Sequence, residues 1–202
     1  MAKKTMILVF IWLIYSFSEY YILPYFIKPL TWFVICLTLL ILSVKEIINI
    51  VNNRKNLIGI TLLNLLVELS LLVITFYNFN KIPNSIIEKL DWYTSYETRN
   101  QIVNDVFKEK SELNSKINND IYELSFELPI ISNGGNDIWI YQNKTDKKKT
   151  IKFWISRGYF ESPQTYFIFT NDNKIRKQLE DKITENPETN WKLEENWYRI
   201  ME

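Results

Sequence analysis

The sequence of 202 residues contains no histidine and a single cysteine, Cys36. Without histidine, acid–base catalysis by imidazole, histidine-ligated metals and haem with an axial histidine are excluded. One cysteine forms neither an intramolecular disulfide nor a cysteine metal cluster. The four glycines are too few and too scattered to build a P-loop or a dinucleotide-binding fingerprint. These absences exclude many of the common catalytic and cofactor sites.

Charge is nearly balanced, with 24 Lys and Arg against 23 Asp and Glu. Binding to nucleic acid requires a strongly basic surface, so nucleic acid is excluded as a partner. The distribution is uneven, because the first eighty residues hold six basic and three acidic side chains and are otherwise almost wholly apolar. Beyond Asn78 the composition is that of an ordinary soluble domain.

Three apolar stretches in the first part are each long enough to cross a bilayer, which takes about 20 helical residues. They are residues 6–26, 30–51 and 57–77. Buried helices of a soluble core are the alternative, but a chain of this size has too little polar surface to cover three such runs. A cleaved signal peptide does not fit, because the first run is too long and lacks a small-residue cleavage site. We therefore predict a three-span transmembrane region over residues 1–80 and a separate domain over residues 81–202.

The orientation follows from the basic residues that flank these stretches. Lys3 and Lys4 precede the first stretch, and Arg54 and Lys55 lie between the second and the third. Short flanks rich in Lys and Arg stay in the cytoplasm. The pattern predicts a multi-pass protein of the cell membrane with a cytoplasmic amino terminus and an extracytoplasmic carboxy-terminal domain.

Two acids, Glu19 and Glu68, fall inside the predicted spans. An ionised carboxylate in the hydrocarbon core is costly, so such residues face a partner or a cavity, or are protonated. Both lie within roughly 5 Å of mid-depth, so we expect that they can meet between the first and third spans. Asn64 lies one turn before Glu68 on the same helix face. These intramembrane polar residues form a proton or cation site, or contact a second membrane protein, or bond between helices and serve packing.

Beyond residue 81 the apolar pattern alternates between helical and strand periods. Helical spacing predicts helices over residues 84–90, 94–107 and 174–183, the second opening with the capping box Thr94-x-x-Glu97. Alternation predicts strands over residues 121–128, 137–142, 150–156, 165–170 and 191–200. We expect an α+β domain with a four- to five-stranded antiparallel sheet and two or three helices mostly on one face.

The middle strands are apolar on both faces, and one face is aromatic. We expect this face to carry Trp139, Tyr141, Trp154 and Tyr166, with Trp197 on the same side. The aromatic face either forms a second small core or binds a partner, since Trp and Tyr supply much of the binding energy at interfaces. Arg157 is a further contact candidate, with a salt bridge that fixes its loop as the alternative.

The segments Leu128-Pro129-x-x-Ser132-x-Gly134-Gly135 and Phe153-x-x-x-Arg157-Gly158 stand on either side of the strand at residues 137–141. This pattern resembles small uncharacterised bacterial membrane-anchored proteins, in which an L-P…S-x-G-G turn precedes paired strands and an F-x-x-x-R-G segment. The resemblance extends over about residues 98–198. It implies a bacterial source and a membrane-anchored domain, and it brings no activity with it.

No catalytic constellation is visible, so we expect neither an enzyme nor a cofactor or metal site. The leading hypothesis is an integral membrane protein with a non-enzymatic extracytoplasmic binding domain, serving immunity, envelope sensing or an accessory role. The alternative is a small transport or proton-coupled subunit that uses Glu19 and Glu68 within an oligomer. The expected partners are membrane lipid and another membrane or extracytoplasmic protein. The Lys-rich run at residues 144–149 is either a solvated turn or a contact with anionic headgroups or wall polymer.

Overall fold

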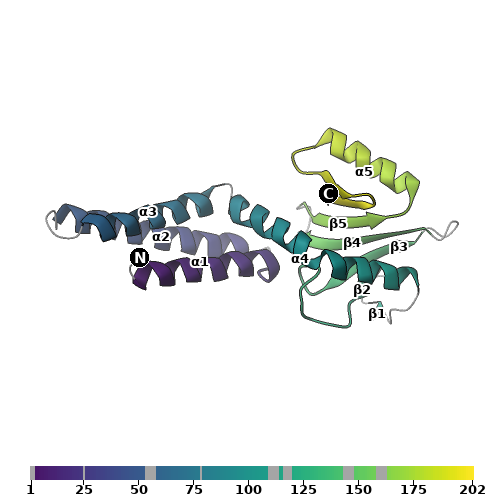
Figure 1. The fold of residues 1–202 in the computed structure, drawn as a ribbon, viewed down its shortest axis with the longest axis horizontal. Coiled ribbons are helices and arrows are strands. Elements are labelled where there is room, and N and C mark those ends of the chain that lie inside the picture. Colours follow the sequence, from purple (N-terminus) through teal and green to yellow (C-terminus); the bar gives the residue numbers. More distant parts are fainter. Residues whose placement is uncertain are drawn as a thin grey trace. The chain divides into compact units, whose positions relative to one another are not determined.

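The computed structural model describes residues 3–24, 26–52, 58–77, 79–108, 114–115, 120–142, 148–157 and 163–202. The chain divides into two compact units, Met1–Leu90 and Asp91–Glu202. The basic connection around Arg54 and the Lys-rich run before Lys148 lie outside the described residues. Figure 1 shows a helical first unit and a second unit built on a β-sheet.

The first unit contains the helices α1 (Lys3–Tyr21), α2 (Lys28–Asn52) and α3 (Ile58–Phe76) and the beginning of α4 (Lys81–Phe107). Within the described residues, two helices, α2 and α3, are long and apolar enough to cross a membrane. Only 17% and 28% of the residues in their apolar stretches are buried, so these helices do not resemble the core helices of a soluble protein.

The prediction of three spans is wrong, because α1 is not among the helices that are long and apolar enough to cross a membrane. The helix ends at Tyr21, ahead of Pro24, so the apolar residues Ile22 and Leu23 do not extend it. Its carboxy-terminal end also carries Glu19 among serines and tyrosines. The remaining apolar run is shorter than the roughly 20 residues that a span requires.

Hydrogen bonds nevertheless fix α1 beside α3 along much of its length. Thr5 Oγ1 donates to Asn64 Oδ1 at 2.5 Å, and Trp12 Nε1 donates to Thr75 Oγ1 at 2.7 Å. Trp32 Nε1 of α2 donates to the carbonyl of Thr75 at 2.8 Å. Three helices therefore meet around polar groups of α3 that would otherwise lie unpaired in an apolar environment.

Helix α4 is continuous where the sequence predicted two helices. Pro83 lies in its first turn, where a missing N–H costs no intrahelical hydrogen bond, so the proline does not end the helix. Thr94 lies in the middle of α4, and its hydroxyl donates to the carbonyl of Asp91 at 3.5 Å instead of capping a new helix.

The second unit is built on a seven-stranded sheet. Its strands are β1 (Asn114–Ser115), β2 (Ile121–Glu123), β3 (Asp137–Gln142), β4 (Lys149–Ser156), β5 (Thr165–Thr170), β6 (Trp191–Glu194) and β7 (Trp197–Met201). The spatial order is β1-β2-β3-β4-β5-β7-β6, and all neighbouring pairs are antiparallel. The predicted count of four to five strands is wrong, because the last predicted strand turns at residues 195–196 into the pair β6–β7 and β1 gave no apolar signal.

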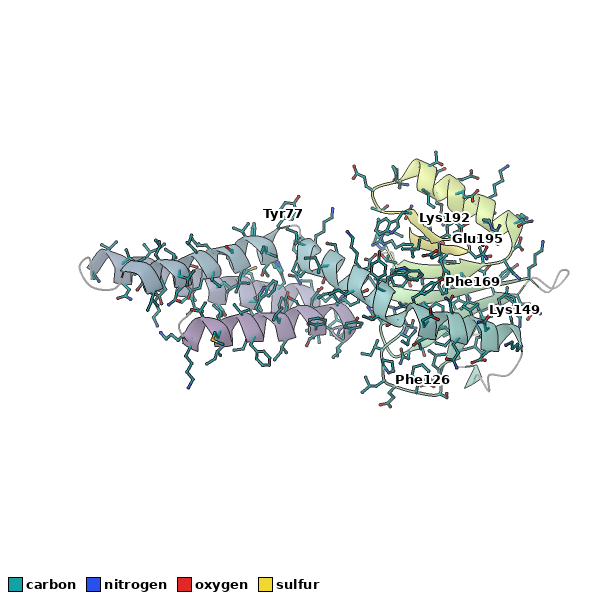
Figure 2. All side chains as sticks on the ribbon, viewed as in Figure 1. Tyr77, Phe126, Lys149, Phe169, Lys192 and Glu195 are labelled. Atoms are coloured by element: carbon teal, nitrogen blue, oxygen red, sulfur yellow. The ribbon has the colours of Figure 1, made fainter. Side chains whose placement is uncertain are left out.

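The carboxy-terminal half of α4 covers one face of this sheet. Trp92 packs against Phe167 and Trp197, with ring centroids 5.0 and 5.3 Å apart. At the end of α4, Lys149 Nζ, labelled in Figure 2, donates to the carbonyl of Val106 at 2.7 Å. The Lys149 ammonium satisfies a carbonyl at the helix end and complements the negative end of the helix dipole. Trp197 belongs to this face, so its predicted place on the aromatic side is wrong.

Helix α5 (Asn173–Glu185) covers part of the opposite face, so the helices lie on both faces rather than mostly on one (Figure 1). Asp172 caps α5 by accepting a hydrogen bond from the N–H of Lys174 at 2.8 Å. Leu179 is the buried contact of α5 with a core of strand residues. These strand residues are Trp154, Tyr166, Ile168, Tyr198 and Ile200.

The connection between β2 and β3 is organised by the side-chain amide of Asn136. Its Oδ1 accepts hydrogen bonds from the N–H groups of Ile131 and Ser132 at 2.6 and 3.1 Å. Its Nδ2 lies 2.9–3.2 Å from the carbonyls of Phe126, Glu127 and Pro129. Asn136 itself has φ 55°, a left-handed conformation that asparagine tolerates better than most residues.

Candidate functional site

A groove opens on the α5 face of the sheet, beside the helix and over β3 and β4. Five strand residues line it: Trp139, Tyr141, Thr150, Lys152 and Ile168. Helix α5 contributes Ile175, Gln178, Leu179 and Lys182, and Glu202 follows β7. The groove has a volume of about 240 Å³. It exists because one helix is too narrow to cover the whole face of a seven-stranded sheet.

Three charged side chains form a network along the groove. Glu202 accepts hydrogen bonds from Lys152 Nζ at 2.7 Å through Oε2 and from Lys182 Nζ at 2.9 Å through Oε1. Burial disfavours the ionised carboxylate, but the two ammonium groups outweigh it and hold the pKa of Glu202 below its usual value. Glu202 is therefore ionised at neutral pH, and the network carries two positive charges and one negative charge.

Trp139 forms the wall of the groove beside this network. The Lys152 ammonium lies 4.5 Å from the centroid of the Trp139 ring, which is a cation–π contact. The indole Nε1 of Trp139 is buried and has no hydrogen-bond acceptor among the described residues. A buried donor without an acceptor is destabilising, so the Trp139 indole is a costly feature of this wall.

Trp154 and Tyr166, two other residues of the predicted binding surface, lie on the same face but are buried. The Trp154 indole and the Tyr166 hydroxyl both donate to Gln164 Oε1, at 2.8 and 2.7 Å. Burial, with Glu202 as a second cause, raises the pKa of Tyr166 to about 12. These two aromatic residues therefore act as core, while Trp139 and Tyr141 remain accessible, with Tyr141 half exposed at 51%.

Arg157 follows β4 and lies over the Trp154 ring, with its guanidinium carbon 4.6 Å from the ring centroid. Its Nη1 donates to Asp137 Oδ2 at 3.0 Å and to the carbonyl of Gly134 at 3.1 Å. The structure thus gives Arg157 the loop-fixing ion pair that was one of its two predicted roles. A Cβ on Gly134, which has φ +88°, would lie 3.1 Å from Arg157 Cδ, so the close approach favours glycine.

Among the polar residues that the sequence predicted to lie within the membrane, Glu19 is buried and has partners at both carboxylate oxygens. Lys28 Nζ lies 3.5 Å from its Oε1, and Asn80 Nδ2 donates to its Oε2 at 3.2 Å. Asn80 has φ 67° in the turn before α4, which turns its side chain back toward α1. Glu19 therefore holds helix ends together, as expected of a packing role.

Glu68 does not meet Glu19. The hydrogen bond from Trp12 to Thr75 sets these two residues side by side. Glu68 precedes Thr75 by seven residues on α3, whereas Glu19 follows Trp12 by seven residues, or about 10 Å of helix, on α1. The two acids therefore lie on opposite sides of this hydrogen bond along the helix axes. Glu68 Oε2 is buried without a partner among the described residues, and Asn64 is engaged by Thr5. The predicted polar residues therefore lie at two separate positions, Glu19 at one and Asn64 and Glu68 at the other, and do not form one site.

The sequence did not identify Lys182 and Glu202, which line the groove together with Lys152. Lys182 follows Ile175 by seven residues and belongs to the helix face that packs on the sheet, so its position was visible in the periodicity of α5. Glu202 gave no signal, because its pairing with Lys152 depends on β7 lying beside β5 in the sheet. Within the described residues, no group of three or more Asp, Glu or Cys side chains is arranged to hold a metal ion.

Comparison of the chain with protein-family models, with curated proteins and with solved structures gives no match.

Proposed function

We propose that this protein is a membrane-anchored binding protein, whose second unit holds its ligand in the groove between α5 and strands β3 and β4. The groove itself is the observation that carries the proposal. It combines accessible aromatic rings, an apolar floor and a charged network, which is the usual make-up of a ligand site. A second small hydrophobic core, the alternative for this aromatic face, would be closed to solvent.

The membrane anchor in this proposal is the pair of helices α2 and α3, most of whose apolar side chains point away from the unit. Arg54 and Lys55 in their connection favour a cytoplasmic location for that end. Helix α3 then ends on the outer side, so the second unit is extracytoplasmic. The bond between Thr5 and Asn64 ties the amino-terminal end of α1 to the cytoplasmic end of α3.

Photocrosslinking in intact membranes tests the binding role. A benzophenone amino acid replacing Tyr141, which lines the groove and is half exposed, should yield an adduct of defined mass. The same group replacing Glu188, an exposed residue outside the groove, is the matched control and should not yield it. Gln178→Trp fills the groove from an exposed position on α5 and should abolish the adduct. An adduct that persists in this variant, or that forms equally at residue 188, would refute the proposal.

The rival proposal, a proton-coupled subunit, draws support from the unpartnered Oε2 of Glu68. The variant Glu19→Gln/Glu68→Gln separates the two proposals. Because neither acid lines the groove, we expect the adduct at residue 141 to form as in the parent chain. Conversely, if this variant assembles correctly and its adduct still forms, loss of the protein's activity in the cell would favour transport.

A further inference from the structure

We propose that the groove takes a small amphiphilic carboxylate, whose anionic head lies at Lys152 and Lys182 and whose apolar chain lies on the wall between the sheet and α5. This inference rests on the proposed function and names the chemical class of its ligand.

The charges of the groove favour an anion. Its lining side chains include two ammonium groups and one carboxylate, so these side chains carry one positive charge in excess. An ammonium has three N–H donors, and Glu202 accepts one from each lysine. No other acceptor for Lys152 or Lys182 occurs among the described residues, and the Lys182 side chain is 41% exposed. A ligand carboxylate can therefore bind both lysines without displacing Glu202, through charge-assisted hydrogen bonds.

The rest of the groove favours an apolar body. Ile168, Ile175 and Leu179 present only carbon atoms, and Trp139 adds a broad ring. A volume of about 240 Å³ lies just below the roughly 300–1,000 Å³ that is usual for pockets of drug-sized ligands. The groove therefore suits one short chain rather than a diacyl lipid.

Trp139 links the two ends of the groove. Its ring lines the apolar wall, while its buried Nε1 donor has no acceptor among the described residues and Lys152 lies over the same ring. A carboxylate bound to Lys152 lies beside the Trp139 ring, so its negative charge changes the surroundings of the indole N–H. A neutral chain of the same length gives the lysines no such acceptor.

The test uses the full chain in phosphatidylcholine nanodiscs, with octanoate as the probe. The indole N–H signal of Trp139 in a ¹⁵N NMR spectrum, assigned by its loss in Trp139→Phe, reports occupancy of the groove. We expect octanoate to shift this signal saturably. Octan-1-ol, octylammonium and acetate should each bind at least about tenfold more weakly, because each lacks either the anionic head or the chain.

Two variants locate the head. Lys182→Gln should weaken octanoate binding about tenfold and leave octan-1-ol binding unchanged. Lys177→Gln removes the same charge from an exposed position of α5 outside the groove and should have little effect. Equal weakening by both variants, or by neither, overturns the assigned head position.

The outcomes also separate this inference from the proposed function. If octan-1-ol or octylammonium binds as tightly as octanoate, the ligand class is wrong, although the groove remains a binding site. If none of the probes moves the Trp139 signal and no adduct forms at residue 141, the groove is not a binding site and both proposals fail.

Discussion

The substitution Arg99→Met tests the core that joins α4 to the sheet. Arg99 is only 1% exposed, and its Nη2 donates to Asp91 Oδ2 at 2.6 Å. Its Nε and Nη2 donate to the carbonyl of Ile131 at 3.2 and 3.0 Å, and its guanidinium lies 4.7 Å from the centroid of the Phe167 ring. Met fills a similar apolar volume but supplies neither charge nor donors. The Asp91 carboxylate then remains buried without its cation.

The expected loss in the free energy of unfolding follows from the burial of this ion pair. Removal of one partner from a buried ion pair costs about 3–5 kcal/mol, because the remaining charge stays desolvated. Replacement of both partners in Asp91→Leu/Arg99→Met removes the stranded charge and leaves mainly the Ile131 carbonyl without its donor. That group costs about 1–3 kcal/mol. The double variant should therefore be more stable than Arg99→Met, by about 2 kcal/mol.

Urea unfolding of the full chain in a mild detergent measures these differences. Trp92 and Trp197, which pack together in this core, provide the fluorescence signal. Glu97→Met, an exposed change on the same helix, is the control and should shift the free energy of unfolding by less than about 0.5 kcal/mol. The reasoning is refuted if Arg99→Met costs less than about 1 kcal/mol, or if the double variant is no more stable than the single one.

Two further predictions concern pH and topology. The pKa of Tyr166 is raised by burial to about 12, so the folded state keeps a proton that the unfolded state releases above about pH 10. Stability should thus fall by about 2 kcal/mol between pH 10 and 12, and Tyr166→Phe should lack this part of the fall; an identical pH profile in the two proteins would contradict it. In a Cys36→Ser background, an impermeant thiol reagent applied to intact cells should label Glu188→Cys but not Asn52→Cys, both at exposed positions. The reverse labelling would invert the proposed orientation.

Much of the second unit could be predicted from local pattern. The alternation of β3, β4 and β5 sets their bounds to within a residue, because each strand is fixed by its own apolar spacing. Asp172, which caps α5, and Pro187, which follows it, bracket that helix in the sequence. By contrast, the turn at residues 195–196 contains no glycine or proline, so nothing local separates β6 from β7.

The candidate site was less predictable, because it depends on pairs that are distant in the chain. Trp139 and Tyr141 were found from their residue types, but the face they share with α5 follows from the order of the strands. Glu202 lies 50 residues from Lys152 in the sequence, and no spacing rule connects them. In the first unit the rise of a helix placed Glu19 and Glu68 at similar depth, but Asn80 and Lys28 bind Glu19 instead.

The amide of Asn136 ties distant parts of the β2–β3 connection to one side chain. Five backbone groups between Phe126 and Ser132 bond to this single side chain. Loss of the amide would remove this partner from all five groups at once, and Ser132 would then hold the end of the segment through its bonds with Asp137 and Trp154. Because the Ile131 carbonyl in the same segment also accepts hydrogen bonds from Arg99, a change at Asn136 reaches helix α4 through this one backbone group.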